Sequence, residues 1–126
     1  MIKITIPGRP ITKKNSQRMI LLKNGRRMVR PSAQFEAYQE AAGWAIEPHR
    51  GLMLTGPVNV KAVYFMPTRG RVDLLNLLEA TCDILVHYGV LEDDNSRVVA
   101  SHDGSRVFYD KTNPRVEIEI TEVPER

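Results

Sequence analysis

The chain has 126 residues, of which 42% are hydrophobic and 26% charged. This length and composition are typical of one globular domain and exclude a disordered chain. No apolar run reaches the ~18 residues that span a bilayer, and the N-terminus has no signal-peptide pattern. The single cysteine, Cys82, excludes an internal disulfide and a cysteine-based zinc site. We therefore expect a cytoplasmic protein without membrane contact, in which Cys82 is a buried thiol.

The formal net charge of +3 is unevenly distributed along the chain. Residues 1–31 contain nine Lys or Arg and no Asp or Glu, whereas residues 32–126 contain nine basic and fifteen acidic residues. Such an asymmetry indicates a polyanion-binding surface beside an acidic region.

The first 31 residues predict a strand, a basic loop and a hairpin. Residues 2–6 alternate between isoleucine and polar residues, which indicates a half-buried strand that Pro7-Gly8 ends. Residues 9–18 form a polar, basic loop. Within residues 19–30, Asn24-Gly25 favours a hairpin with a type I′ turn, in which both central residues have positive φ. The hairpin would present Lys23, Arg26, Arg27 and Arg30.

Two helices with a strand between them follow along the chain. Ser32 can cap a helix that runs to about Glu47, before Pro48, and we expect Trp44 on this helix to belong to the core. Residues 58–66 alternate as a strand. Residues 73–88 predict a second helix that Gly89 closes.

The C-terminal third predicts short strands at 97–101 and 105–109, joined as a hairpin at Asp103-Gly104, and a last strand at 116–120. The element order predicts a single α+β domain spanning residues 1–126. We expect one mixed β-sheet with two main helices packed largely on one of its faces.

The second predicted helix is apolar nearly all round, except for one polar arc. On a helical wheel, Asp73, Asn76, Glu79, Asp83 and His87 fall within about 120°. A solvent-facing stripe normally mixes charges of both signs, but this arc contains no Lys or Arg, and like charges at this spacing repel. We interpret these five residues, called the acidic seam below, as part of a functional site.

The loop after this helix adds Glu92, Asp93 and Asp94. Alone, it would be typical of an ordinary capping loop. Oxygen ligands without clustered Cys or His favour a hard cation, Mg²⁺ or Mn²⁺. Carboxylates beside a basic surface suit phosphodiester chemistry, because a cation activates the phosphoryl group while Lys and Arg hold the backbone.

Four segments resemble the RusA family of Holliday junction resolvases from phages and prophages. They read PITKKN (10–15), RVDLLNLLE (71–79), DIL (83–85) and GVLEDD (89–94). The resemblance is collinear and extends over almost the whole chain. It implies an α+β homodimer that makes paired, Mg²⁺-dependent nicks at four-way DNA junctions, without an organic cofactor, in the cytoplasm of a bacterial host.

The resemblance also implies roles for individual residues. Asp73 and Asp94 fall on metal-binding aspartates of the family, and Asn76 matches its motif asparagine. Two positions depart from the motif: Leu75 stands where the family has an aspartate, and Glu79 where it has the catalytic lysine. Glu79 could restore a carboxylate in a rearranged site.

Two hypotheses of function follow. The first is a metal-dependent junction endonuclease with catalytic candidates Asp73, Glu79, Asp83 and Asp94, and metal ligands Asp73, Asp93 and Asp94. The second is a non-catalytic protein that binds branched or single-stranded nucleic acid through a degraded metal site. Both assign the same nucleic-acid contacts: Lys13, Lys14, Asn15, Arg18, Arg26, Arg27, Arg30, Arg71 and Asn76.

Overall fold

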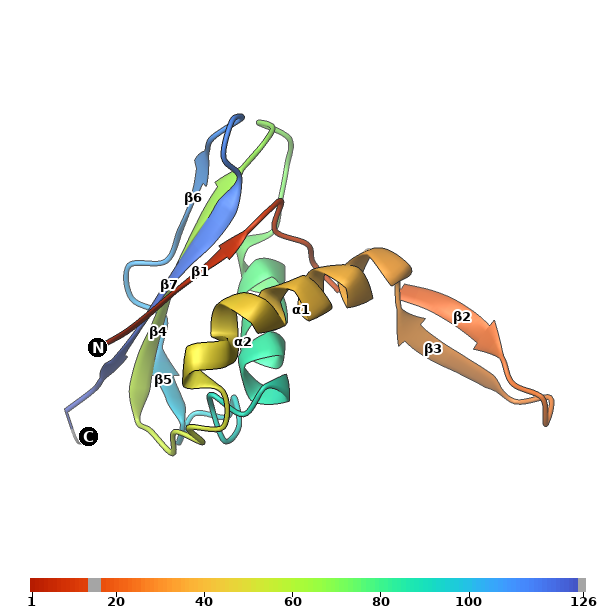
Figure 1. Ribbon diagram of the computed structural model, residues 1–126, viewed down its shortest axis with the longest axis horizontal. Helices are drawn as coiled ribbons and strands as arrows, with labels where there is room; N and C mark the ends of the chain where they lie inside the picture. The colour runs from red at the N-terminus through yellow and green to blue at the C-terminus, as the bar shows by residue number, and fades with distance from the viewer. Residues whose placement is uncertain (14–16, 125–126) are drawn as a thin grey trace.

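A five-stranded mixed sheet carries both main helices on one face (Figure 1). The computed structural model describes residues 1–13 and 17–124, with only the backbone of Gln17, Arg18, Ile20, Arg30 and Pro31. In the sheet, β7 (Arg115–Glu122) lies between β1 (Ile2–Pro7) and β4 (Val58–Met66) and is antiparallel to both. The predicted α+β class and the strands at the two ends of the chain are confirmed.

The far edge of β4 is covered by two short strands, β5 (Val99–Ser101) and β6 (Arg106–Tyr109). Both run parallel to β4, so the predicted hairpin between them is wrong. The turn that separates them is held against β4 by Asn59. Its Oδ1 accepts hydrogen bonds from Ser101 Oγ at 2.6 Å and Asp103 N at 2.7 Å. These hydrogen bonds hold the turn between β5 and β6 against β4. The chain can therefore pass from β5 to β6 without reversing its direction.

The core lies between the sheet and the helices. Along β4 the residues alternate strictly between buried and half-buried, as their period-2 pattern predicts. Helix α2 (Leu74–His87) buries seven of its fourteen residues. The hydroxyls of Tyr64 on β4 and Thr81 on α2 share a 2.6 Å hydrogen bond, which satisfies both buried groups.

Helix α1 (Ala33–Ile46) begins at the predicted cap, because Ser32 Oγ accepts a hydrogen bond from Phe35 N at 3.1 Å. A 3₁₀ turn, η1 (Glu47–His49), follows at the predicted stop. The expectation that Trp44 belongs to the core is wrong, since its side chain is 84% exposed. Ala42 and Ile46 face the core, and a residue two positions from each points to the opposite side of a helix.

The two helices meet at Gly43 of α1 and Tyr88, which caps the C-terminus of α2. Tyr88 Oη donates a hydrogen bond to Gln39 O at 2.7 Å, and a Cβ atom on Gly43 would lie 2.7 Å from the same hydroxyl. Gly89 then takes a φ of 70°, which confirms the predicted end of the helix.

The predicted hairpin is present, but it forms a sheet of its own. Strands β2 (Gln17–Leu21) and β3 (Arg27–Pro31) pair only with each other and project from the N-terminal end of α1, away from the main sheet (Figure 1). The predicted type I′ turn is wrong, because only Gly25 has positive φ. Leu22 N bonds to Arg26 O at 2.8 Å, closing a three-residue loop with a left-handed glycine. Among the described residues, no helix is long and apolar enough to cross a membrane.

Candidate active site

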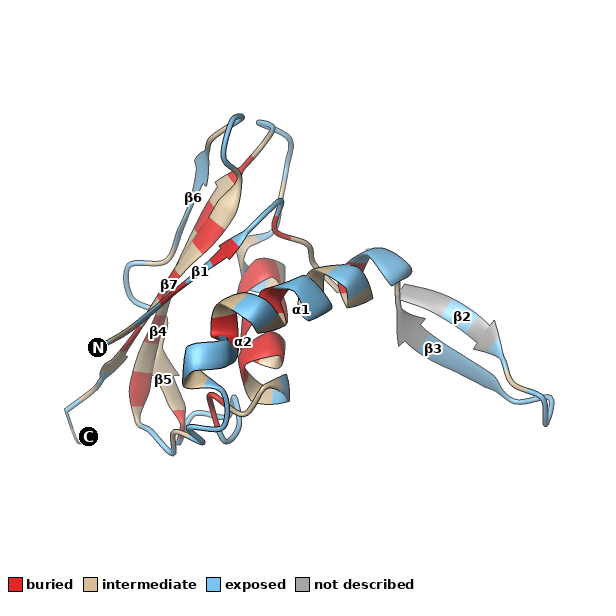
Figure 2. Cartoon of the chain, in the orientation of Figure 1, coloured by how far each residue is buried: buried red, intermediate tan, exposed pale blue. Residues whose placement is uncertain are grey.

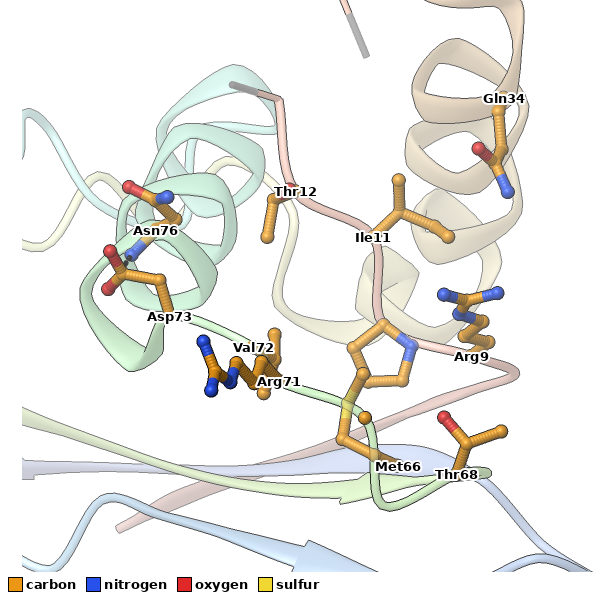
Figure 3. Close-up of a pocket in the computed structure, with 12 residues that line it drawn as sticks. Arg9, Ile11, Thr12, Gln34, Met66, Thr68, Arg71, Val72, Asp73 and Asn76 are labelled. Atoms are coloured by element: carbon orange, nitrogen blue, oxygen red, sulfur yellow. Dashed lines mark hydrogen bonds between the residues drawn. The ribbon is translucent and has the colours of Figure 1, made fainter. Parts of the chain in front are cut away.

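The N-terminal loop passes between α1 and α2 and forms one wall of a cleft of about 640 Å³ (Figure 3). The opposite wall is the start of α2 and the segment before it, residues 70–76. Gln34, in the first turn of α1, and Arg9, from the loop, line the same space. The cleft therefore joins the basic N-terminal segment to the beginning of the acidic seam.

Asp73 occupies the N-cap of α2, at the border of this cleft. Its Oδ1 accepts hydrogen bonds from Leu75 N at 2.9 Å and Asn76 N at 3.4 Å. A carboxylate at a helix N-terminus is favoured by the helix dipole and satisfies amides that lack a helical partner. The position of Asp73 is thus fixed by the same bonds that start the helix.

The acidic seam lies on the outer side of α2, as the helical wheel predicts. All five of its residues are exposed or half-buried, whereas their apolar neighbours Leu77, Leu78, Ile84 and Leu85 are buried. The seam does have a cation beside it, but this cation comes from another part of the chain. Lys13 Nζ lies 3.2 Å from Asp83 Oδ2, and 5.7 Å from the centre of the Phe35 ring.

The loop after α2 organises its own carboxylates. Asp93 Oδ1 accepts a hydrogen bond from Asp94 N at 2.7 Å, and Asp93 Oδ2 accepts one from Asn95 Nδ2 at 3.0 Å. These bonds hold the pKa of Asp93 below its usual value. The pKa of Asp94 is raised, first by burial and then by the hydrogen bond to Asp93 and the charges of Asp83 and Asp93. Asp83 and Asp93 therefore both lie close enough to Asp94 to raise its pKa.

Cys82 lies beside this group but is not part of its chemistry. The thiol is buried, which confirms the prediction, and burial together with the charges of Asp94 and Asp83 raises its pKa to about 12. A thiol with this pKa stays protonated near neutral pH and is a poor nucleophile or ligand.

The predicted carboxylates thus fall into two groups along α2. Asp73 and Asp83 are ten residues apart, which corresponds to about 15 Å along a helix axis at ~1.5 Å per residue. Among the described residues, no three His, Cys, Asp or Glu side chains come together in metal-binding positions. Either group still fits Mg²⁺, which is usually bound by one or two carboxylates and completed by water and phosphate oxygens.

The predicted nucleic-acid contacts that the structure describes lie in three places. Arg71 and Asn76 line the cleft, Lys13 lies at the seam, and Arg26 and Arg27 are exposed at the end of the hairpin. Lys14 and Asn15 lie outside the described residues, as do the side chains of Arg18 and Arg30. The sequence reasoning assigned no role to Arg9 and Gln34, which line the cleft. Only the place of Arg9 in the basic loop could have indicated its involvement.

Among protein families, the chain matches one of endodeoxyribonucleases, enzymes that cut DNA strands internally. The matching family is RusA, described as "Endodeoxyribonuclease RusA", and its model covers residues 7–121. This match spans nearly the whole chain, so the protein belongs to the RusA family and shares its expected activity as a Holliday junction resolvase on branched DNA. Among curated proteins, none matches the chain.

Proposed function

We propose that this protein is a divalent-metal-dependent endonuclease that resolves four-way DNA junctions by paired, symmetric nicks. One observation carries the proposal within the RusA family. The basic N-terminal loop meets the acidic seam at the 3.2 Å contact between Lys13 and Asp83, beside the cleft that Asp73 borders. Phosphate-binding and metal-binding side chains therefore adjoin each other.

The basic residues have the task of holding the DNA backbone. Arg9 and Arg71 lie on opposite walls of the cleft, where each can contact a phosphate of a strand that enters it. Arg26 and Arg27 are exposed on the hairpin and would contact a neighbouring DNA duplex of the junction. Such contacts fix the register of the DNA but do not read its sequence.

The carboxylates have the task of holding Mg²⁺ or Mn²⁺. A bound divalent cation would polarise the phosphoryl oxygens and lower the pKa of a water molecule for attack on phosphorus. The candidate ligands are Asp73 in one of the two groups and Asp94, with Asp93 and Asp83 near it, in the other. Burial is the main cause of the raised pKa of Asp94, and the charges of Asp83 and Asp93 add to it; a cation among these carboxylates would relieve that repulsion.

Lys13 supplies the positive charge that the helix itself lacks. The motif position that carries a lysine in the resemblance is Glu79 here, an exposed residue one turn before Asp83. With its ammonium already at Asp83, Lys13 could pair with a phosphate oxygen once a metal ion binds that carboxylate. Glu79 remains available as an additional carboxylate on the same seam.

The symmetry of the substrate supports a homodimer. A four-way junction with two-fold symmetry presents two equivalent strands, and two identical subunits place one site on each. We propose that such a dimer acts in the cytoplasm of a bacterial host, encoded by a phage or prophage.

Nicking of a fixed four-way junction with labelled arms, in the presence of Mg²⁺ or Mn²⁺, tests the proposal. We expect cuts at symmetric positions in opposite strands, seen on a denaturing gel. Millimolar Mn²⁺ is also expected to raise the melting temperature of the free protein, because a ligand that binds only the folded state stabilises it.

The alternative is a non-catalytic protein that binds branched or single-stranded nucleic acid. It is favoured by the substitutions at Leu75 and Glu79 and by the lack of a three-carboxylate cluster among the described residues. It predicts salt-sensitive junction binding without nicking and without stabilisation by Mn²⁺. A folded wild-type protein that binds junctions in this way would replace the nuclease proposal.

A further inference from the structure

The projecting hairpin, residues 17–31, is called the arm below. It is a two-stranded ribbon outside the main sheet, and its described residues are exposed except for the half-buried Leu22 (Figure 2). The arm contains no Asp or Glu, and its basic residues are Arg18, Lys23, Arg26, Arg27 and Arg30. Its partner must therefore be strongly negative.

One face of the arm also carries exposed apolar side chains, together with Arg27, which pairs with Leu21. Met19 is 61% exposed, Leu21 71% and Val29 57%. Met19 pairs directly with Val29 in the strand register, and Leu21 lies two residues further along the same strand, so all three side chains share a face. An isolated two-stranded ribbon is only marginally stable in water. A partner that covers this apolar strip would stabilise the arm.

The arm is attached at the rim of the cleft. Its first strand follows the loop that carries Lys13, whose ammonium lies at the acidic seam. Its second strand leads into α1 through Ser32, and Gln34 in the first turn of that helix lines the cleft. The arm and the cleft are thus joined by short segments of the chain, so one extended ligand could contact both.

These observations together indicate which kind of partner binds the arm. The partner must present negative charge around an apolar surface, and it must reach the cleft at the same time. The branch point of a DNA junction does so, because it exposes the faces of unstacked bases between phosphates. A two-fold contact of one arm with the arm of a second copy would be opposed by their like charges.

We propose that the arm inserts into the branch point of a junction. Met19, Leu21 and Val29 lie against unstacked bases there, while Lys23, Arg26 and Arg27 bind the flanking phosphates. This proposal rests on the proposed function, since it names the part of the chain that distinguishes a junction from duplex DNA. The basic residues supply affinity for any DNA, and the apolar strip supplies the preference for a branch.

Binding measurements on the full chain test the proposal, with a four-way junction that carries 2-aminopurine at its centre and with a duplex of the same sequence. The serine variant, Met19→Ser/Leu21→Ser/Val29→Ser, removes the apolar strip. A second variant, Met19→Leu/Leu21→Met/Val29→Ile, keeps the strip apolar. Leu52→Ser is the control at an exposed leucine elsewhere. We expect the serine variant alone to lose about tenfold or more of its preference for the junction, as stacking on one or more bases is lost. Binding of the wild-type protein should raise the fluorescence of 2-aminopurine at the centre of the junction, and the serine variant should not produce this rise. Its binding to the duplex should be unchanged.

The charge variant Arg26→Gln/Arg27→Gln separates affinity from preference. It should weaken binding to both DNAs and reduce the salt slope of duplex binding by about 1.8, at ~0.9 per phosphate contact, while the junction preference stays.

The possible failures are distinguishable. A wild-type protein that binds junction and duplex equally would overturn the proposed function and the arm proposal together. A wild-type preference that the serine variant retains would overturn the arm proposal alone. Conversion of a wild-type dimer to a monomer by the serine substitutions, seen by sedimentation, would also overturn it, because the strip would then be a contact between subunits.

Discussion

Asp73 has two roles that two substitutions can separate. Asp73→Asn keeps an oxygen that accepts the hydrogen bonds from Leu75 N and Asn76 N, and Asn and Asp cap helices about equally well. Asp73→Ala removes the cap, which typically costs about 1 kcal/mol. For a domain of this length, that corresponds to a fall in melting temperature of about 4 °C.

Both substitutions remove the charge that we place at the metal. Because a catalytic metal ion contributes several kcal/mol to transition-state stabilisation, we expect each to reduce the nicking rate by about a hundredfold or more. Asp103→Asn, the same chemical change in an exposed turn, serves as the control and should change neither property.

Single-turnover nicking of a junction in Mn²⁺ and thermal melting without metal give the two readouts. The expected pattern is an asparagine variant that melts like the wild type but does not cut, and an alanine variant that melts earlier and does not cut. An asparagine variant that cuts at the wild-type rate would refute the role of Asp73 in the site. An alanine variant with unchanged melting would refute its role as a cap.

Three further predictions concern the surroundings of the site. Lys13→Gln should change stability by less than about 1 kcal/mol, because its ion pair with Asp83 is partly exposed. The same substitution should weaken junction binding in a titration. An unaltered affinity for the junction would show that Lys13 is not part of the DNA interface. Gly43→Ala should lower stability to urea by about 1–3 kcal/mol through overpacking against Tyr88, and the loss should vanish in a Tyr88→Ala background; a loss that persists there would point to another cause. The buried Cys82 thiol, with its pKa raised to about 12, should resist thiol reagents near neutral pH until the protein unfolds, so rapid labelling of the native protein would contradict its burial.

The elements of this fold were predictable because their signals are local. Strand β4 shows its period of two in nine consecutive residues. Ser32 caps α1, and Gly89 ends α2. The pairing of β5 and β6 was not predictable in this way. It depends on the amide of Asn59, more than forty residues away in the chain, which holds the turn against β4.

The site was predictable in composition but not in geometry. A helical wheel places Asp73 and Asp83 within one arc, but it contains no information about distance along the axis, which separates them by about 15 Å. The contact of Lys13 with Asp83 joins residues seventy positions apart, and no spacing pattern encodes it. Likewise, the outward position of Trp44 depends on the helical phase, which the buried residues Phe35, Ala42 and Ile46 set.

The cap at Asp73 also bears on how this motif can change during evolution. Replacement of this aspartate removes a charge at the cleft and loosens the start of α2, so selection for folding and selection for activity act on the same side chain. Leu75 is 74% exposed and Glu79 is exposed as well, so folding places little demand on either position. Substitutions at these two exposed positions are therefore compatible with a stable fold.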